Sequence, residues 1–274
     1  MDEIKKTGEV YSFLWKKVRN GSAPKTYHFA EIQELVLEPI VRGKIGIDVG
    51  TGCGYDTYYM AKNNPGVRIV GLDLSEGIHT AKRISAGLQN AFFLQGSVLE
   101  LPLKDNVFDF AYSFGVLHHT PDPSRGLREI ARVIKTGAPV FIYLYEDHSQ
   151  NPIKHEIIRA VSFVRRITTN IHPFFLYFLS FLFSPLAVIF FSYPSWIMRR
   201  FRATARIADK MPFNFGTHPF SVAGDLYDRF SAPIEYRFSK SGMRELFAQI
   251  GFTDIKIGRL KSKAGWVAWG FKAR

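Results

Sequence analysis

The chain has 274 residues, is 46% hydrophobic, carries a formal net charge of +12 and contains one cysteine, Cys53. This composition excludes disorder as the default state and an intrachain disulfide, and no Cys/His cluster has the spacing of a zinc site, so we expect no metal. The charged start, Met1–Arg19, lacks the apolar stretch of a signal peptide, and together with the single cysteine it indicates a cytoplasmic protein. The positive charge favours an anionic partner: nucleic acid, a phosphorylated substrate or anionic lipid headgroups.

From residue 44 onward, apolar runs alternate with helical patterns. Strands are predicted over 44–49, 67–73, 91–95, 108–113 and 139–145, and helices over 55–63, from Ser75 to about residue 86, and from Asp122 or Ser124 to 134. The alternation stops after Glu146 and resumes with a predicted helix over 239–250 and strands over 252–258 and 265–272. This pattern predicts a doubly wound, Rossmann-like α/β fold whose ligands bind at the carboxyl ends of the strands.

The same pattern predicts how the chain is divided. We expect an N-terminal helical cap over 1–43, a core over 44–147, an apolar insertion with basic flanks over 148–232, and a helix and strands over 233–274 that complete the core.

A glycine-rich turn follows the first predicted strand, in the run Asp48-Val49-Gly50-Thr51-Gly52-Cys53-Gly54. Glycines allow a sharp bend and let a ligand approach the backbone, and the helix that follows offers unpaired N–H groups. The spacing G-x-G-x-G differs from the G-x-G-x-x-G of dinucleotide folds, because Tyr55 stands where the third glycine would fall. A phosphate-binding loop would need Gly-Lys-Ser/Thr, which is absent.

An acidic residue, Asp73, ends the second predicted strand, 23 residues after Gly50. This is where an acid accepts hydrogen bonds from both ribose hydroxyls of a bound nucleoside. The alternative is a structural turn followed by an unrelated surface aspartate, and the pairing of turn and acid favours the nucleoside site.

Five stretches resemble class I S-adenosylmethionine-dependent methyltransferases, in particular the small-molecule branch that includes the ubiquinone/menaquinone-biosynthesis type. They are IGIDVGTGCG (45–54), VGLDLS (70–75), GSVLELPLKDNVFDFAYSFGVLHHT (96–120), REIARVIKTGAPVFIYLYE (128–146) and SKSGMRELFAQIGFTDIKI (239–257). The resemblance implies a seven-stranded sheet whose last strand is antiparallel, and S-adenosylmethionine as the cofactor.

The resemblance also implies roles for individual residues. The methionyl part of the cofactor would be wrapped by Gly50, Thr51, Gly52 and Gly54, and its ammonium group would be reached by Asp48. The ribose would be held by Asp73 with Leu74, and the adenine would be flanked by Ser97 and Val98. The sulfonium end would be lined by the backbone at Ser113 and Phe114, up to Gly115. Many family members carry Asp at the position of Ser97, so the contact with the adenine amino group is weaker here or comes from backbone.

The residues that follow the fourth predicted strand indicate which kind of atom accepts the methyl group. Enzymes that methylate amino groups of DNA carry Asn/Asp-Pro-Pro-Tyr there, whereas this chain has Ser113-Phe114-Gly115-Val116, which favours oxygen or carbon acceptors. Methyl transfer depends mainly on alignment, and a hydroxyl acceptor also benefits from a base. We predict His119 as that base, with Glu146 or His148 as the alternative. The competing interpretation is that His118 and His119 only pack and cap the following helix.

The insertion contains a run, 167–198, with no Asp, Glu, Lys or Arg, flanked by Arg165-Arg166 and Arg199-Arg200-Phe201-Arg202. Its length suits a transmembrane helix, but both of its ends must return to one sheet, and Pro185 is expected to break the helix into halves too short to cross. We therefore expect a hairpin that dips into one leaflet and makes peripheral membrane contact through 167–202 on the cytoplasmic face. The alternative is a protein-buried lid over a greasy pocket.

The leading hypothesis is a methyltransferase for a lipophilic or lipid-linked small molecule, with no nucleic-acid partner, because the basic residues flank an apolar block instead of alternating with exposed aromatics. A soluble natural-product O-methyltransferase with a hydrophobic lid, a nucleic-acid-directed protein and a non-catalytic cofactor-binding protein are the alternatives. Aromatic side chains of the N-terminal cap, Tyr11, Trp15 and Tyr27, either close over the sulfonium or belong to the core. The sequence does not indicate an oligomeric state.

Overall fold

The computed structural model describes residues 3–17, 28–36, 38–208, 211, 219–260 and 265–273. The chain forms two compact units: residues 1–155 with 234–274, and residues 156–233. We describe each unit by itself.

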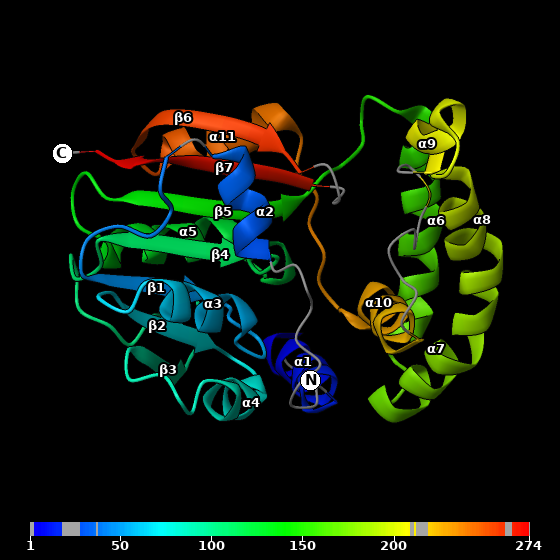
Figure 1. Ribbon diagram of the computed structural model, residues 1–274, viewed down its shortest axis with the longest axis horizontal. Coiled ribbons are helices and arrows are strands. Elements are labelled where there is room, and N and C mark those ends of the chain that lie inside the picture. Colours follow the sequence, from blue (N-terminus) through cyan, green and yellow to red (C-terminus); the bar gives the residue numbers. More distant parts are fainter. Residues whose placement is uncertain are drawn as a thin grey trace. The chain divides into compact units, whose positions relative to one another are not determined.

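The first unit is built on a seven-stranded sheet in the order β3-β2-β1-β4-β5-β7-β6 (Figure 1). Its strands are β1 Ile45–Val49, β2 Arg68–Asp73, β3 Ala91–Gln95, β4 Phe110–Phe114, β5 Pro139–Tyr145, β6 Phe252–Arg259 and β7 Gly265–Lys272. Strands β1 to β5 are parallel, and β7 runs antiparallel between β5 and β6. The predicted doubly wound sheet with an antiparallel last strand is confirmed, and the order of strands reverses between β1 and β4, where ligands of such sheets bind.

Helices cover both faces of this sheet. Helix α3 (Tyr55–Asn63) and helix α4 (Gly77–Ile84) follow β1 and β2, and α5 (Pro123–Val133) and α11 (Lys240–Gln249) precede β5 and β6. The Asp122 side chain caps α5 by accepting from the N–H of Arg125, and the Ser239 hydroxyl caps α11 by accepting from that of Gly242. Two further helices, α1 (Glu3–Lys16) and α2 (His28–Leu35), come before the sheet.

The sheet separates two apolar cores. On one face, Ile47, Val49 and Ala111 pack with side chains of α5 and α11. On the other, Phe110 and Tyr112 pack with side chains of α2 and α3. Alternate residues of β4 therefore point to opposite faces, and both are buried, which explains why the strand reads as continuously apolar.

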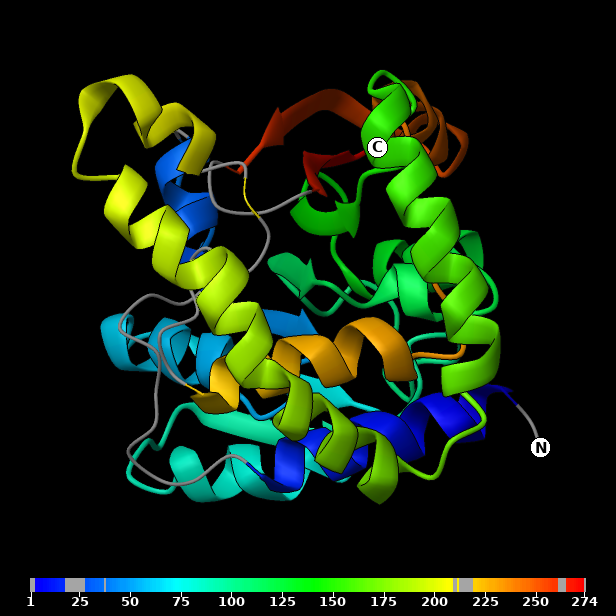
Figure 2. The ribbon, with the colours of Figure 1, turned by 90° about the vertical axis from the view of Figure 1, so that its right-hand side faces the viewer.

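The second unit consists of helices (Figure 2). Helix α6 (Pro152–Thr168), which begins in the first unit, leads to α7 (Pro173–Ala187), a π-helical turn (Val188–Ser192) and α8 (Tyr193–Met198), followed by α9 (Arg202–Ala208) and α10 (Pro219–Ser231). Helix α10 packs along α7, where the Tyr177 and Tyr227 rings meet edge to face. The end of α6 holds the end of α10, because Thr168 and Arg165 donate to the carbonyls of Phe230 and Ala232.

The prediction that Pro185 breaks the apolar run into the two halves of a hairpin is wrong. Residues Pro173–Met198 form one continuous helix of 26 residues. Proline removes the N–H that would bond the carbonyl of Phe181, and the Ser184 hydroxyl donates to that carbonyl instead, at 2.8 Å. The π-helical turn ends two residues before Pro194, a second residue without an N–H, and accommodates the irregularity there.

Candidate functional site

The turn after β1 has the left-handed backbone that its glycines permit. Gly50, Gly52 and Gly54 have φ of 80°, 57° and 85°. A Cβ on Gly50 would lie 2.0 Å from a methyl group of Val116, and one on Gly54 would lie 2.5 Å from the Cβ of Ala81. Substitution at either position would therefore strain the turn and collide with the neighbouring segment.

The carboxylate of Asp73 joins this turn to the start of the next segment. Its Oδ2 accepts from the N–H of Gly52 at 2.7 Å, and its Oδ1 accepts from the N–H and the hydroxyl of Ser75 at 2.8 and 2.6 Å. Burial raises the pKa of Asp73, and these three donors oppose the rise. An acid held in this way at the end of β2 keeps its oxygens in a fixed position beside the glycine turn.

Asp48 lies beneath the turn and is almost fully buried. Its Oδ2 accepts from the Thr57 hydroxyl at 2.6 Å, and the Thr57 and Thr51 hydroxyls lie 2.7 Å apart. Burial, with the nearby charge of Asp56, raises the pKa of Asp48 to about 7. Its side chain is not part of the wall of the neighbouring cavity.

One cleft of the first unit lies above these groups and contains about 760 Å³ of space, its open mouth included. Nine of the predicted site residues line it: Gly50, Gly52, Asp73, Leu74, Ser97, Val98, Phe114 and His119, together with the backbone-lining Gly115. Thr51, Gly54 and Ser113 support the wall from behind; the Ser113 hydroxyl, for example, donates to the carbonyl of Val49 at 2.7 Å. The cleft thus joins the ends of β1, β2 and β4.

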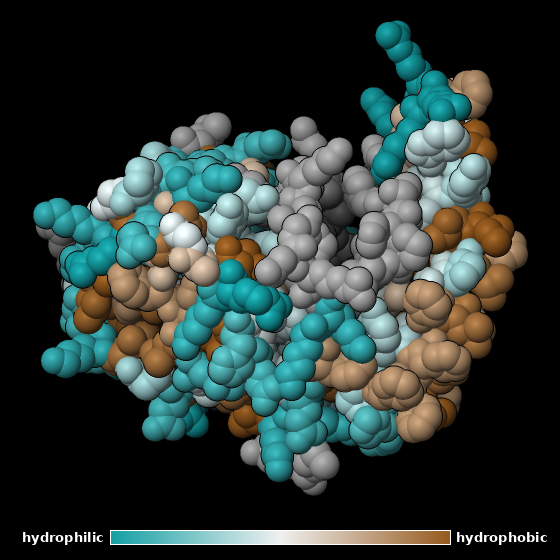
Figure 3. Space-filling view, turned by 60° about the horizontal axis from the view of Figure 1, so that its bottom comes forward, coloured by the Kyte–Doolittle hydropathy of each residue, from teal (hydrophilic) through white to brown (hydrophobic). Residues whose placement is uncertain are grey.

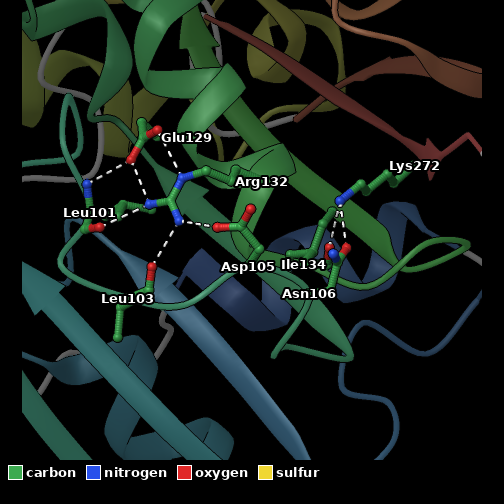
Figure 4. A network of polar contacts seen from close by, with 8 residues as sticks. All are labelled: Leu101, Leu103, Asp105, Asn106, Glu129, Arg132, Ile134 and Lys272. Carbon is green, nitrogen blue, oxygen red and sulfur yellow. Dashed lines mark hydrogen bonds and ion pairs between the residues drawn. The ribbon is translucent and has the colours of Figure 1, made fainter.

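Arg132 of α5 holds residues 101–105, which directly follow the part of the cleft wall formed by residues 96–99 (Figure 4). The Arg132 guanidinium donates to the carbonyls of Leu101 and Leu103, each at 2.8 Å, and pairs with Asp105 and Glu129. Glu129 in turn accepts from the N–H of Leu101 at 2.8 Å. Four of these contacts thus hold residues 101–105, just beyond Ser97 and Val98, the predicted adenine contacts.

His119 is a buried part of the cleft wall. Its Nδ1 lies 2.7 Å from the carbonyl oxygen of Ile234, and its ring lies 5.6 Å from that of Tyr11. Because a carbonyl only accepts, Nδ1 carries the proton of the neutral ring and Nε2 carries the lone pair. His118 is also buried but packs away from the cleft, its ring stacked on Tyr145 with centroids 3.9 Å apart.

The alternative bases, Glu146 and His148, lie elsewhere. Glu146 pairs with Arg259, and the Nδ1 of His148 lies 3.2 Å from Glu146 Oε2. Neither side chain lines the cleft, and Glu146 instead faces a second groove with Asp147, Ser239 and Trp266. Burial lowers the pKa of His148 to about 4. Of the three base candidates, the structure brings only His119 to the predicted cofactor residues.

Helix α1, which lies beside α4 (Figure 1), contributes residues to the wall of the cleft. The Trp15 ring rests against the glycine turn, 3.0 Å from where a Cβ on Gly52 would lie, and Tyr11 lines the cleft beside it. Tyr27 lies outside the described residues. The sequence missed other lining residues from the same helix, Ile4, Thr7 and Gly8, because a short polar-apolar helix gives no signal of what it covers.

Comparison with known proteins identifies the domain. Residues 47–142 match the family model described as "Methyltransferase domain". Demethylmenaquinone methyltransferase of Corynebacterium kroppenstedtii is 33% identical over 147 residues, 49% of this chain and 57% of its own length. Norajmaline N-methyltransferase of Rauvolfia serpentina is 32% identical over 128 residues, 45% of this chain and 42% of its own length. The chain thus spans about half the length of these relatives.

The fold extends beyond the matched segment. A chain of the Haloferax volcanii complex between the methyltransferase activator Trm112 and a methyltransferase is similar over 96% of this chain and 98% of its own, with a TM-score of 0.56 and 16% identity. At that identity the likeness concerns the fold alone. The family model, the sheet order and the relatives agree that residues 47–142 are a methyltransferase domain of the S-adenosylmethionine-dependent class I type.

Proposed function

We propose that this protein transfers a methyl group from S-adenosylmethionine to oxygen or carbon of a lipophilic or lipid-linked small molecule at a membrane surface. The observation that carries the proposal is the pairing of a cleft built from the glycine turn and Asp73 with a 26-residue apolar helix in the same chain. The cleft supports S-adenosylmethionine as the methyl donor, and the apolar helix supports a lipophilic acceptor.

The residues of the cleft fit the donor. The glycines have left-handed backbone and no side chains, which leaves room for the methionyl part of the donor. A Cβ on Gly52 would fill the space between the turn and the Trp15 ring. Asp73 Oδ2 accepts one hydrogen bond from the protein and can accept another from a ribose hydroxyl, and Val98 and Leu74 offer apolar surface for a base. Asp48 supplies negative charge beneath the turn for the ammonium group, with Thr51 and Gly54 shaping the backbone between them. S-adenosylmethionine, when bound, supplies a methyl group already activated by its sulfonium.

The work left to the protein is alignment and proton removal. Phe114 and Gly115, at the end of β4, border the space where the acceptor would meet the methyl group. His119 stands on the same wall, and its Nε2 would take the proton from an acceptor hydroxyl as the oxygen–carbon bond forms and the carbon–sulfur bond breaks. Its Nδ1–H, donated to Ile234, holds the ring in the tautomer that this step needs.

The membrane part of the proposal rests on the second unit. Fourteen large apolar side chains of the Pro173–Met198 helix are exposed, and only 22% of its most apolar window is buried. This favours membrane contact over the buried-lid alternative, since within the described residues no protein surface covers that face. The absence of acidic residues between Glu156 and Asp209 favours the anionic cytoplasmic leaflet.

A methyl-label transfer experiment tests the acceptor. The protein is incubated in detergent with labelled S-adenosylmethionine and either the lipid extract or the aqueous metabolite fraction of cells. We expect label in the lipid extract, in products stable to the acid and base treatments that separate ethers and carbon-methylated products from methyl esters. Label confined to the aqueous fraction would replace this proposal with a soluble small-molecule methyltransferase, and label in added RNA would replace it with a nucleic-acid enzyme.

A further inference from the structure

The second unit presents an apolar surface that runs the whole length of one helix. The exposed side chains of the Pro173–Met198 helix are Phe174, Phe175, Phe178, Leu179, Phe181, Leu182, Phe183, Leu186, Ile189, Phe190, Phe191, Tyr193, Trp196 and Ile197. An aromatic side chain has ~150–250 Å² of surface, and about half of the surface of each of these side chains is exposed. The set therefore presents an apolar surface on the order of 1,000 Å², which is larger than the apolar patches of a few hundred Å² usual on a monomer. Figure 3 shows hydrophobic side chains gathered along this helix. We call these fourteen residues the docking face.

The opposite side of the helix is packed against protein. Its buried residues are mostly small, including Ser180, Ser184 and Ala187, and small side chains let α10 approach closely. Helix α10 carries Asp225, Asp228 and Arg229 within its 13 residues. The pair therefore has one apolar side and one side bordered by charged residues, as an interfacial helix has.

Length alone would allow the helix to cross a membrane. Twenty-six residues span about 39 Å, more than the ~30 Å of a hydrocarbon core. A crossing would, however, carry the charged residues of α10 into that core along with α7, and such residues are costly there. An orientation parallel to the membrane keeps α10 on the aqueous side while it buries the whole docking face.

The charges around the helix favour the same orientation. From Ile157 to Ala208 the chain has seven arginines and no acidic residue. Arg166 lies just before the helix, and Arg200 and Arg202 lie just after it, with the Arg200 guanidinium 3.8 Å from the centre of the Trp196 ring. A crossing helix would send one of these basic ends to the far leaflet, against the usual distribution of positive charge. A helix lying flat brings both ends to the same anionic headgroups.

We infer that the Pro173–Met198 helix docks flat on an anionic membrane leaflet, with its docking face immersed and α10 kept on the aqueous side. The inference rests on the proposed membrane-surface function and specifies its partner and the mode of contact. A shallow, reversible attachment of this kind would bring the enzyme to acceptors dissolved in the same leaflet.

The first arm of the test measures binding. The full-length protein is sedimented with vesicles of phosphatidylcholine alone or with added phosphatidylglycerol. We expect binding to the anionic vesicles, weakened by roughly 100-fold in Phe178→Glu/Phe190→Glu and by roughly tenfold in Arg200→Gln/Arg202→Gln. The matched controls are Phe92→Glu, an exposed phenylalanine of β3, and Lys82→Gln/Lys104→Gln, and both should bind like the wild type. Equal binding to all vesicles by every variant would overturn the inference.

The second arm measures orientation. Nitroxide labels are attached to Phe178→Cys, Ile189→Cys and Ile197→Cys, which follow one face of the helix, in a Cys53→Ala background. Collisions with oxygen and with a water-soluble nickel complex report the depth of each label. A flat helix places all three labels at one shallow depth. A profile that is deepest at Ile189 and shallow at both ends would show a crossing helix and contradict the inference.

The alternative partner of the docking face is a second copy of the protein. Sedimentation velocity without lipid distinguishes it: a discrete dimer that Phe178→Glu/Phe190→Glu dissociates, together with no vesicle binding, would assign the face to a second copy. The docking variants should also keep methyl transfer in detergent. Failure of docking would leave that activity intact, whereas failure of the proposed reaction would leave vesicle binding intact, so the two proposals are judged separately.

Discussion

His119 donates from Nδ1 to the carbonyl oxygen of Ile234 at 2.7 Å, and this bond joins the wall of the cleft to the segment that follows the insertion. The bond fixes the ring and its tautomer, so that the basic nitrogen is Nε2. Removal of this histidine separates its proposed chemical role from a packing role.

We expect His119→Gln to lower kcat for a hydroxyl acceptor by about 10²- to 10³-fold, since a positioned base contributes this much. The affinity for S-adenosylhomocysteine should change little. The deficit should shrink as pH rises, because the acceptor then loses its proton without help. The control is His79→Gln, an exposed histidine of α4. An unchanged kcat, or a deficit that is the same at every pH, would assign His119 to packing.

Asp73→Asn should weaken S-adenosylhomocysteine binding by about 10- to 100-fold, measured by calorimetry. The substitution keeps the volume but removes the charge that the N–H of Gly52, the Ser75 groups and the ribose hydroxyls share, and a hydrogen bond to a charged group is worth ~1.5–3 kcal/mol. Asp254→Asn, at an exposed position whose left-handed backbone asparagine tolerates, is the matched control. Equal affinities in the two variants would contradict the assigned ribose contact.

Asp48 should make stability depend on pH. Its pKa in the folded protein, about 7, is above its ordinary value, so its contribution is complete below about pH 4 and is lost as pH rises through 7. Asp48→Asn removes that loss while Thr57 keeps an acceptor. We therefore expect a Tm several degrees above wild type at pH 8 and close to wild type at pH 4, by calorimetry. The same variant should bind S-adenosylhomocysteine less tightly. A Tm gain of equal size at both pH values would refute the titration of Asp48.

Two basic residues in Figure 4, Arg132 and Lys272, provide a paired test of the cleft wall at residues 96–99, which includes the predicted adenine contacts. Arg132→Ala leaves the carbonyls of Leu101 and Leu103 without their donor and should cost ~2 kcal/mol or more of the free energy of unfolding. Because it also frees the segment after Val98, affinity for S-adenosylhomocysteine should fall. Lys272→Ala breaks bonds to Asn106 and to the carbonyl of Ile134, farther along the chain. It should lower stability but not affinity, and equal losses of affinity would show that Arg132 has no special role.

The sheet was largely predictable because each of its strands carries its own signal. The runs 91–95, 139–145 and 265–272 match the observed strands, and the glycine turn and Asp73 mark the ends of β1 and β2. The matching features are local: apolar runs, turn residues and caps. For the same reason the methyl donor could be predicted from short motifs.

The failures depended on contacts that the sequence does not display. Pro185 was predicted to end a helix, and it does not, because the Ser184 hydroxyl donates to the Phe181 carbonyl that the proline leaves without an N–H partner. Glu146 and His148 follow a strand that ends at the correct edge of the sheet, but Arg259, more than a hundred residues away in the chain, draws Glu146 into a separate cluster. Such partners become visible only when the fold brings them together.

Helix α1 has a kinetic consequence. It is fastened to α4 by the ion pair of Lys16 with Glu76 and by the Ser12 hydroxyl, which accepts from the N–H of Glu76, while Trp15 rests on the glycine turn. Under the proposed function, we expect these contacts to break when the donor or its demethylated product moves past this helix. Such breaking would slow product exchange, so we expect the first methyl group to be transferred faster than those that follow.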